Sequence, residues 1–65
     1  RDYDLIQVVL RLEPKYRLPV HLFYYEGYSI KEISQILNEK ESTIGTRLKR
    51  ARTKLKDMLG SDYYG

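Results

Sequence analysis

The sequence predicts a small all-α domain of four helices that contains a helix-turn-helix and ends in a long, basic helix. Three observations support this fold class. Apolar residues recur at helical spacing in several segments, helix start and stop signals separate those segments, and no segment has the pattern of a strand. A chain of 65 residues makes one domain, so we expect a single unit over residues 1–65, with helices at about 4–12, 14–26, 29–37 and 41–59 and a tail at 60–65.

The first two helices are separated by a proline. The first has a broad aliphatic face, which we expect to pack on helices two and three, and Asp2 or Asp4 can cap it. Glu13 precedes Pro14 and is biased away from helical geometry, so the first helix ends there. Pro14 can open the second helix, where its missing N–H costs nothing. Pro19 lies inside the second helix and predicts a kink just before it, or a separate first turn.

The third helix has the clearest start signal. Ser29 and Glu32 have the spacing of a capping box, and Asn38 suits a left-handed C-cap. A short turn over residues 38–40 then leads into the basic helix. Two helices joined by such a turn match a helix-turn-helix, in which the second helix reads DNA.

The basic helix has two faces. Residues 42–56 carry six positive charges and no acidic residue. Helical spacing predicts a buried stripe of Ile44, Leu48, Ala51, Leu55 and Met58. The opposite face carries short hydroxyls and long cations, which hydrogen-bond base edges and phosphates in a major groove. By itself, this pattern fits a DNA reader and a solvated basic helix about equally well.

Composition restricts the other possibilities. There is no cysteine for a disulfide or a thiolate metal site, no apolar run long enough to span a membrane and no secretory signal pattern. The chain begins with Arg1 rather than methionine, so we expect it to be a fragment or a processed product. Residues 1–26 carry no net charge and residues 27–65 carry +3, which favours a polyanionic partner for the second half.

Three segments resemble region 4 of bacterial extracytoplasmic-function sigma factors: Lys15-Tyr16-Arg17, FYYEGYSIKEISQIL at 23–37, and STIGTRLKRARTKL at 42–55. The resemblance implies a cytoplasmic bacterial protein without a cofactor. It also implies that the last helix enters the major groove of the promoter −35 element, with the residues at Thr46, Lys49 and Arg50 facing the DNA. Its implied partners are promoter DNA, the β flap of the RNA polymerase core and, in many members, an anti-sigma factor.

The candidate site therefore has two groups of residues. The base-facing group is Ser42, Thr43, Thr46, Lys49, Arg50 and Thr53. The group that contacts phosphates or supplies positive field is Ser29, Lys31, Arg47, Arg52, Lys54 and Lys56. Arg50 is the best base reader, because arginine bound to guanine by two hydrogen bonds is the commonest specific contact.

Each assignment has a structural alternative. Arg50 could be solvated or paired with Asp57, and Arg47 and Arg52 could lie over the core with buried stems. Ser29 could act only as a cap. The four tyrosines at positions 16, 24, 25 and 28 could stack on single-stranded bases, although core packing is favoured. His21 has no second metal ligand nearby and is expected at the surface.

Two positions depart from the family pattern. Family members often carry Arg or Lys at the place of Gly45, and glycine also weakens the helix there by roughly 1 kcal/mol relative to alanine. The family often has a serine cap where Lys40 lies. Capping would then pass to Ser42, or Glu41 would act through the helix dipole.

Other classes of function fit less well. The sequence has no glycine-rich phosphate loop, paired carboxylates or serine–histidine–acid set, so we do not expect an enzyme. A small helical adaptor that binds only protein is an alternative. Another is the helix-turn-helix output domain of a different transcriptional regulator, such as a response regulator.

Overall fold

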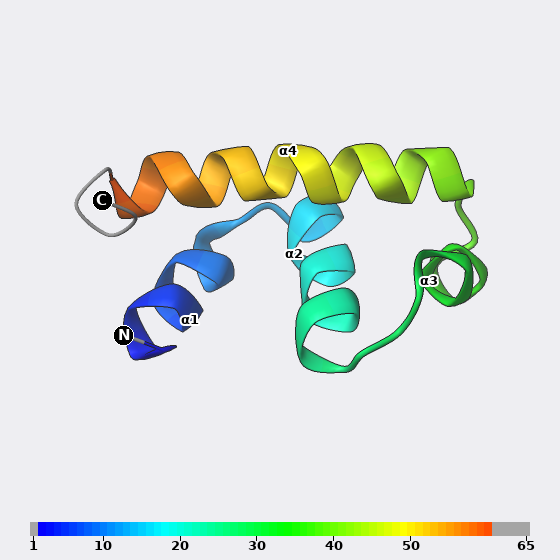
Figure 1. The fold of residues 1–65 in the computed structure, drawn as a ribbon, viewed down its shortest axis with the longest axis horizontal. Coiled ribbons are helices and arrows are strands. Elements are labelled where there is room, and N and C mark those ends of the chain that lie inside the picture. Colours follow the sequence, from blue (N-terminus) through cyan, green and yellow to red (C-terminus); the bar gives the residue numbers. More distant parts are fainter. Residues whose placement is uncertain (1, 61–65) are drawn as a thin grey trace.

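The computed structural model describes residues 2–60, with side chains from Leu5 onward, and within this range it consists of helices and short connections, with no strand (Figure 1). The elements are α1 (Asp2–Arg11), α2 (Pro14–Val20), the π-helical turn η1 (His21–Tyr25), α3 (Ile30–Leu37) and α4 (Glu41–Leu59). The caps expected at Asp2 or Asp4 and the tail at 61–65 lie outside the described side chains and residues. No described helix is both long and apolar enough to cross a membrane.

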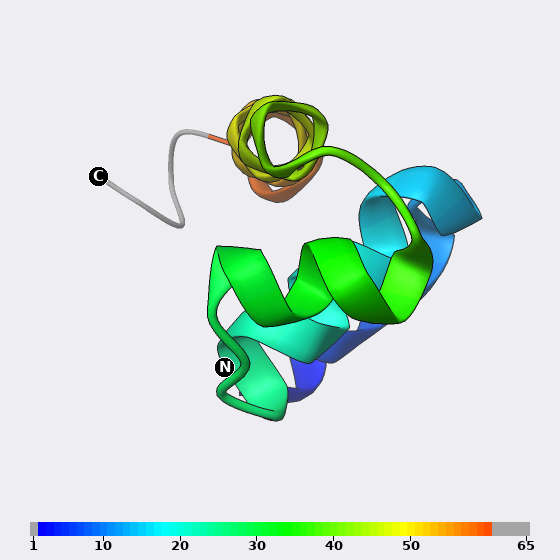
Figure 2. The same ribbon diagram turned by 90° about the vertical axis from the view of Figure 1, so that its right-hand side faces the viewer.

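Helix α4 lies across the other three helices and sets the length of the molecule, 35 Å against 18 Å in the other two directions. Viewed along its axis, α4 has its lower side on the remaining helices and its upper side free of them (Figure 2). The core residues come from all four helices: Val8, Val9, Leu12, Tyr16, Val20, Ile33, Ile44, Leu48, Ala51 and Leu55. A core of this kind fixes one face of α4 and leaves the opposite face to solvent.

The predicted buried stripe of α4 is correct except at its end. Four of its five members are buried in the core, whereas Met58 is 40% exposed. Met58 lies beside the connection between α1 and α2, where it shares a cleft with Arg11, Leu12 and Glu13. Leu59, the next residue, packs against the core instead.

Helix α1 packs mainly against α2 and α4, so the expected packing on helix three was wrong. The helical periodicity of α1 predicted which residues form its apolar face, but it could not indicate that α4 packs against that face. Beyond the end of α1, Leu12 fills the core. Arg17 then ties the two helices together, because its Nη1 donates a hydrogen bond to the Leu10 carbonyl at 3.2 Å.

Pro14 opens α2 as predicted, but the separate first turn, one of the two alternatives expected before Pro19, was wrong. The α-helix continues from Pro14 through Val20. Proline has no backbone N–H, so the hydrogen bond that is missing at Pro19 is the one to the carbonyl of Lys15, in the first turn of the helix. The ring of Pro19 is buried. The departure from α-geometry follows in η1, where the N–H of Glu26 bonds the carbonyl of His21, five residues earlier, at 3.1 Å.

The helix-turn-helix consists of α3, the turn at residues 38–40 and α4. The predicted capping box is present: the N–H of Glu32 bonds Ser29 Oγ at 3.1 Å, and the N–H of Ser29 bonds Glu32 Oε1 at 2.8 Å. Asn38 has a left-handed backbone (φ 54°), as predicted. These local signals end α3 and redirect the chain so that α4 packs against it.

The cap of α4 is Lys40, which makes no side-chain capping bond. Ser42 lies inside the helix, so the expectation that it caps α4 was wrong. Glu41 is the acidic residue of the first turn, where a negative charge interacts favourably with the helix dipole.

Candidate nucleic-acid interface

The outer face of α4 gathers the base-facing candidates. Two shallow clefts adjoin along it. The first is lined by Lys15, Tyr16, Ser42, Thr43, Thr46, Arg47 and Arg50. The second is lined by Tyr16, Thr46, Lys49, Arg50, Thr53, Lys54 and Asp57. Between them, the clefts contain all six candidates. Five of the six are exposed, and Thr43 is half-buried.

Arg50 belongs to both clefts and is exposed. In the described part of the chain it makes no ion pair with Asp57, the alternative that its position allowed. Thr53 Oγ1 donates to the Lys49 carbonyl at 3.3 Å. This hydroxyl bonds its own helix and keeps its lone pairs free to accept.

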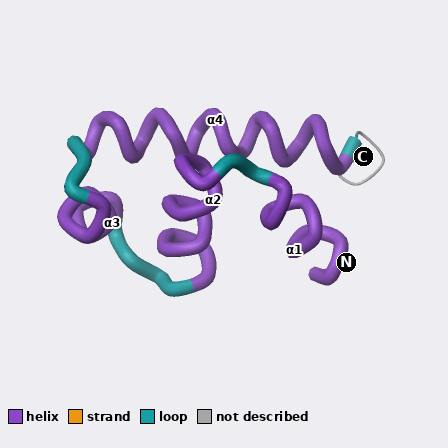
Figure 3. The backbone as a smooth tube through the Cα atoms, turned by 180° about the vertical axis from the view of Figure 1, so that it is seen from behind, coloured by secondary structure: helices purple, strands orange, loops and turns teal. Residues whose placement is uncertain are grey.

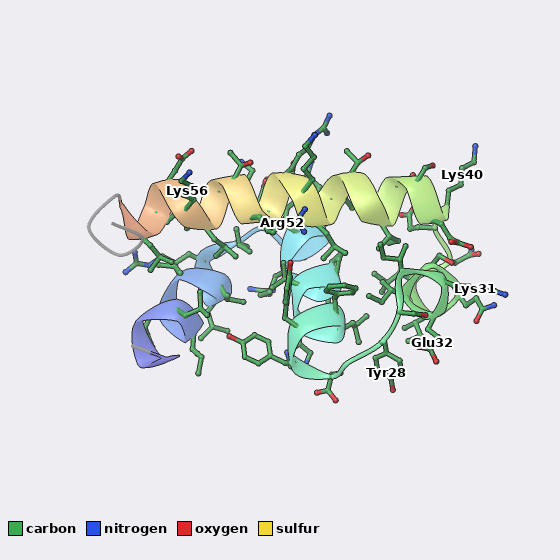
Figure 4. The ribbon with its side chains drawn as sticks, in the orientation of Figure 1. Tyr28, Lys31, Glu32, Lys40, Arg52 and Lys56 are labelled. Carbon is green, nitrogen blue, oxygen red and sulfur yellow. The ribbon has the colours of Figure 1, made fainter. Side chains whose placement is uncertain are left out.

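Two arginines at the margins of the buried stripe have partners within the chain. Arg47 Nη1 lies 3.4 Å from Glu39 Oε2, so it forms an ion pair with the turn that precedes α4. Arg52 Nη1 donates to the Tyr24 hydroxyl at 3.1 Å, and Figure 4 shows its side chain extending from α4 toward α2 and η1. Each guanidinium keeps N–H groups that these contacts do not use, but each is already held in position by a partner within the chain.

The two lysines beyond them lie on opposite flanks of α4. Lys54 lines the second cleft, beside Arg50. Lys56 lines a different, apolar groove together with Arg52. The twelve candidates therefore do not form one continuous surface.

Ser29 and Lys31 lie at the start of α3 and line neither cleft. Lys31 points outward from the end of the molecule (Figure 4). Hydrogen bonding by the Ser29 backbone N–H, and to a smaller extent by its side chain, holds the pKa of the Glu32 carboxyl below its usual value. This helix N-terminus therefore already has a carboxylate partner from its own chain.

Lys15 and Tyr16 line the interface but were not among the predicted site residues. They come from the first turn of α2, which follows the connection that passes beneath α4 (Figure 3). Their approach to α4 depends on tertiary packing, so no local pattern indicates it. The only sequence signal was their place in the Lys15-Tyr16-Arg17 string.

The tyrosines divide into two groups. Tyr16 is buried, as expected, but Tyr24, Tyr25 and Tyr28 are 50%, 47% and 39% exposed, so the core role expected for most of them was wrong. Tyr24 and Tyr25 lie in η1, where the wider turn changes the direction of the side chains relative to an α-helix. His21 is at the surface, as expected, with Nε2 3.1 Å from Glu26 Oε2.

The apolar groove lies on the other flank of α4, between α1, α2 and η1. Its lining is Leu5, Val9, Val20, Tyr24, Tyr25, Arg52, Leu55 and Lys56. It shares no residue with the two clefts of the outer face. An adjoining hollow includes Ile6 and Leu10, which are 42% and 58% exposed. The aliphatic face of α1 is therefore only partly covered by the other helices.

Among the described residues, no cluster of histidine, cysteine and acidic side chains is suited to hold a metal ion. Apart from the carboxylate of Asp57, the charged and hydroxyl groups that α4 contributes to the outer face are cations and hydroxyls, and they come from an exposed helix beside a short turn. This arrangement suits binding of a polyanion.

Comparison with known proteins identifies the chain. The family described as sigma-70, region 4, matches residues 3–55. The ECF RNA polymerase sigma factor SigW of Bacillus subtilis (strain 168) is 40% identical over 53 residues, which are 82% of this chain and 28% of that protein. The chain thus spans less than a third of the length of this relative. The matched region contains α3, the turn and most of α4, and the chain belongs to the sigma-70 region 4 family, which is not a known enzyme family.

Proposed function

We propose that this chain is the C-terminal DNA-binding domain of a bacterial sigma factor, which recognises the promoter −35 element and so directs transcription initiation in the cytoplasm. The observation that carries the proposal is the gathering of six hydroxyl and cationic side chains in two adjoining clefts on the free face of α4. Helix α4 is the second helix of a helix-turn-helix, the element that enters the major groove in this motif.

Within this proposal, Arg50 reads a base edge, because it is exposed and central to both clefts. Thr46 and Lys49 contact neighbouring base pairs, and Ser42, Thr43 and Thr53 accept or donate hydrogen bonds at the margins. Lys54 contacts a phosphate. Arg47 and Arg52 act mainly by holding the turn and η1 against α4, with their positive charge as a secondary contribution.

The second proposed partner is the RNA polymerase core, through its β flap. The apolar groove and the hollow beside it support this assignment, because Tyr24 and Tyr25 are exposed in the groove, and Ile6 and Leu10 are exposed in the hollow, on the flank that the DNA would leave free. Exposed apolar surface of this kind commonly marks a protein-binding site. An anti-sigma factor that covers the groove would compete with the polymerase.

A binding selection from random duplexes tests the main proposal. The expected result is one enriched motif, bound by this chain with an affinity that falls steeply as salt rises. Fluorescence anisotropy on the enriched duplex and on a scrambled duplex then measures specificity. No enrichment, together with no binding at low salt, would contradict the DNA-reader proposal and favour a domain that binds only protein.

A further inference from the structure

Two lysines from different helices converge on one aromatic ring beside the outer face of α4. Lys15 Nζ lies 5.2 Å from the centroid of the Tyr16 ring, and Lys54 Nζ lies 5.3 Å from the same centroid. Both distances are within the range of a cation–π interaction. Two ammonium groups from positions 39 residues apart in the sequence therefore both lie next to the same ring.

The position of this ring is fixed by the fold. Tyr16 is 7% exposed and belongs to the core. The backbone N–H of Tyr16 donates a hydrogen bond to the backbone carbonyl of Glu13 at 2.9 Å, in the first turn of α2. Because the ring cannot move far without opening the core, it restricts where both ammonium groups can lie.

The two lysines continue the cationic surface of the recognition face. Lys15 lines the first cleft and Lys54 lines the second, and Tyr16 and Arg50 line both. The nearby acidic residues are Glu13 and Asp57. Both line a neighbouring cleft together with Lys54, and Asp57 also lines the second cleft of the outer face. Neither forms an ion pair with Lys15 or Lys54 within the described residues. The ammonium groups thus keep their charge available for a ligand.

We infer that Lys15 and Lys54, positioned by the Tyr16 ring, form a clamp for the phosphate backbone of the DNA strand that borders the groove read by α4. This inference rests on the function proposed above and adds a contact from α2 to it. A compact ammonium on a flexible stem binds phosphate as a point charge. Such contacts fix the register of the protein on the duplex without reading sequence. Arg50, in the same two clefts, would then be held at a set depth in the groove.

The test measures how binding to a mixed-sequence duplex depends on salt, for this chain and for single lysine variants. Each phosphate contact contributes about −0.9 to the slope of log K against log salt. Lys15→Ala and Lys54→Ala should therefore each make the slope shallower by up to about 0.9. Lys56→Ala removes the same charge from the opposite flank and should change the slope by less than half as much.

Two further variants test the geometry. Lys15→Arg keeps the charge, so it should keep most of the slope that Lys15→Ala loses. Tyr16→Phe keeps the ring face and should leave the slope unchanged, provided that circular dichroism shows a native helix content and melting midpoint. A shallower slope for a folded Tyr16→Phe variant would contradict the role of the ring.

The outcomes separate this inference from the proposal on which it rests. If the unmodified chain binds with a steep slope but Lys15→Ala binds with the same slope, the clamp is wrong and the DNA reader stands. If Lys56→Ala reduces the slope as much as Lys15→Ala, overall charge explains both effects and the clamp is also wrong. If the unmodified chain does not bind the duplex at low salt, both ideas fail together.

Discussion

Arg52 and Tyr24 join the recognition helix to the π-helical turn. The guanidinium Nη1 of Arg52 donates to the Tyr24 hydroxyl at 3.1 Å, across 28 positions of the sequence. The same ring packs edge-on against Phe23, with the centroids 4.9 Å apart. The hydrogen bond therefore connects α4 to an aromatic pair at the rim of the apolar groove.

The first prediction concerns this hydrogen bond. Tyr24→Phe keeps the ring but removes the acceptor oxygen, so the free energy of unfolding should fall by about 0.5–1 kcal/mol, the lower part of the range for one hydrogen bond. The low end applies because Tyr24 is half-exposed. Chemical denaturation measures the change. In a double-mutant cycle, Arg52→Ala should lower the free energy of unfolding by less in the Tyr24→Phe background than in the unmodified chain. If the two substitutions are fully additive, the hydrogen bond contributes nothing to stability.

The second prediction separates base reading from phosphate contact. Arg50→Ala should cost about 1–3 kcal/mol on the selected duplex and relax preference at one or two base pairs. Lys54→Ala should weaken selected and scrambled duplexes by the same factor, because phosphates carry no sequence information. Anisotropy titrations on both duplexes decide between the roles. Equal losses on both duplexes for Arg50→Ala would show that Arg50 does not read bases.

The third prediction tests the buried stripe of α4. Leu48 is 2% exposed in the core, so Leu48→Ala should open a cavity and cost about 2–5 kcal/mol. In a domain this small, such a loss can unfold most of the population at room temperature. Leu18→Ala is the matched control, since Leu18 is 48% exposed. Thermal melting followed by circular dichroism should show a much larger fall for Leu48→Ala, and similar midpoints for both variants would contradict the assigned faces.

The fourth prediction concerns pH. The pKa of Glu32 is lowered in the folded chain by hydrogen bonding with Ser29. A carboxyl whose folded pKa is depressed stabilises the fold above its unfolded pKa, near 4.3, and this contribution is lost as the pH falls through the folded pKa. Melting midpoints measured from neutral to acidic pH should therefore fall less steeply for Glu32→Gln than for the unmodified chain.

Ser29→Ala serves as the control for this effect, because it removes the capping oxygen that orders the pair. Ser29→Ala alone should also reduce the loss of stability at acidic pH. The double variant with Glu32→Gln should lose as much stability at acidic pH as Glu32→Gln alone. An unchanged pH profile in Glu32→Gln would mean that the capping box does not contribute to the acid sensitivity of the fold.

The sequence predicted those features that depend on neighbouring residues. The capping box, the left-handed Asn38 and the buried spacing of α4 each follow from a few adjacent positions. Features that depend on packing between elements were not predictable in the same way. The partner of Arg52 lies in η1 and Lys15 lies in α2, so both contacts depend on how these elements pack against α4. The exposure of Tyr24 follows from the π-helical turn, which α-helical periodicity cannot indicate.

The last prediction concerns Gly45, where family members often carry Arg or Lys. Apart from its chain neighbours and the nearby backbone of its own helix, a Cβ at this position would meet no heavy atom within 4 Å, and the backbone is not in the left-handed region that favours glycine. Packing within the chain therefore does not require glycine. Gly45→Ala should raise the free energy of unfolding by about 0.5–1 kcal/mol, because alanine loses less conformational entropy in a helix.

Gly45→Lys adds a cation near the start of α4, and Gly45→Ala is its matched control for helix propensity. If a family contact is missing here, the lysine variant should bind a mixed-sequence duplex more tightly than the alanine variant, with a salt slope steeper by at most about 0.9. If the backbone instead approaches the DNA closely at this point, both variants should gain stability and lose affinity, because either side chain would hold α4 away from the groove. A loss of stability in both variants would contradict the open space around Gly45, so melting curves must accompany the titrations.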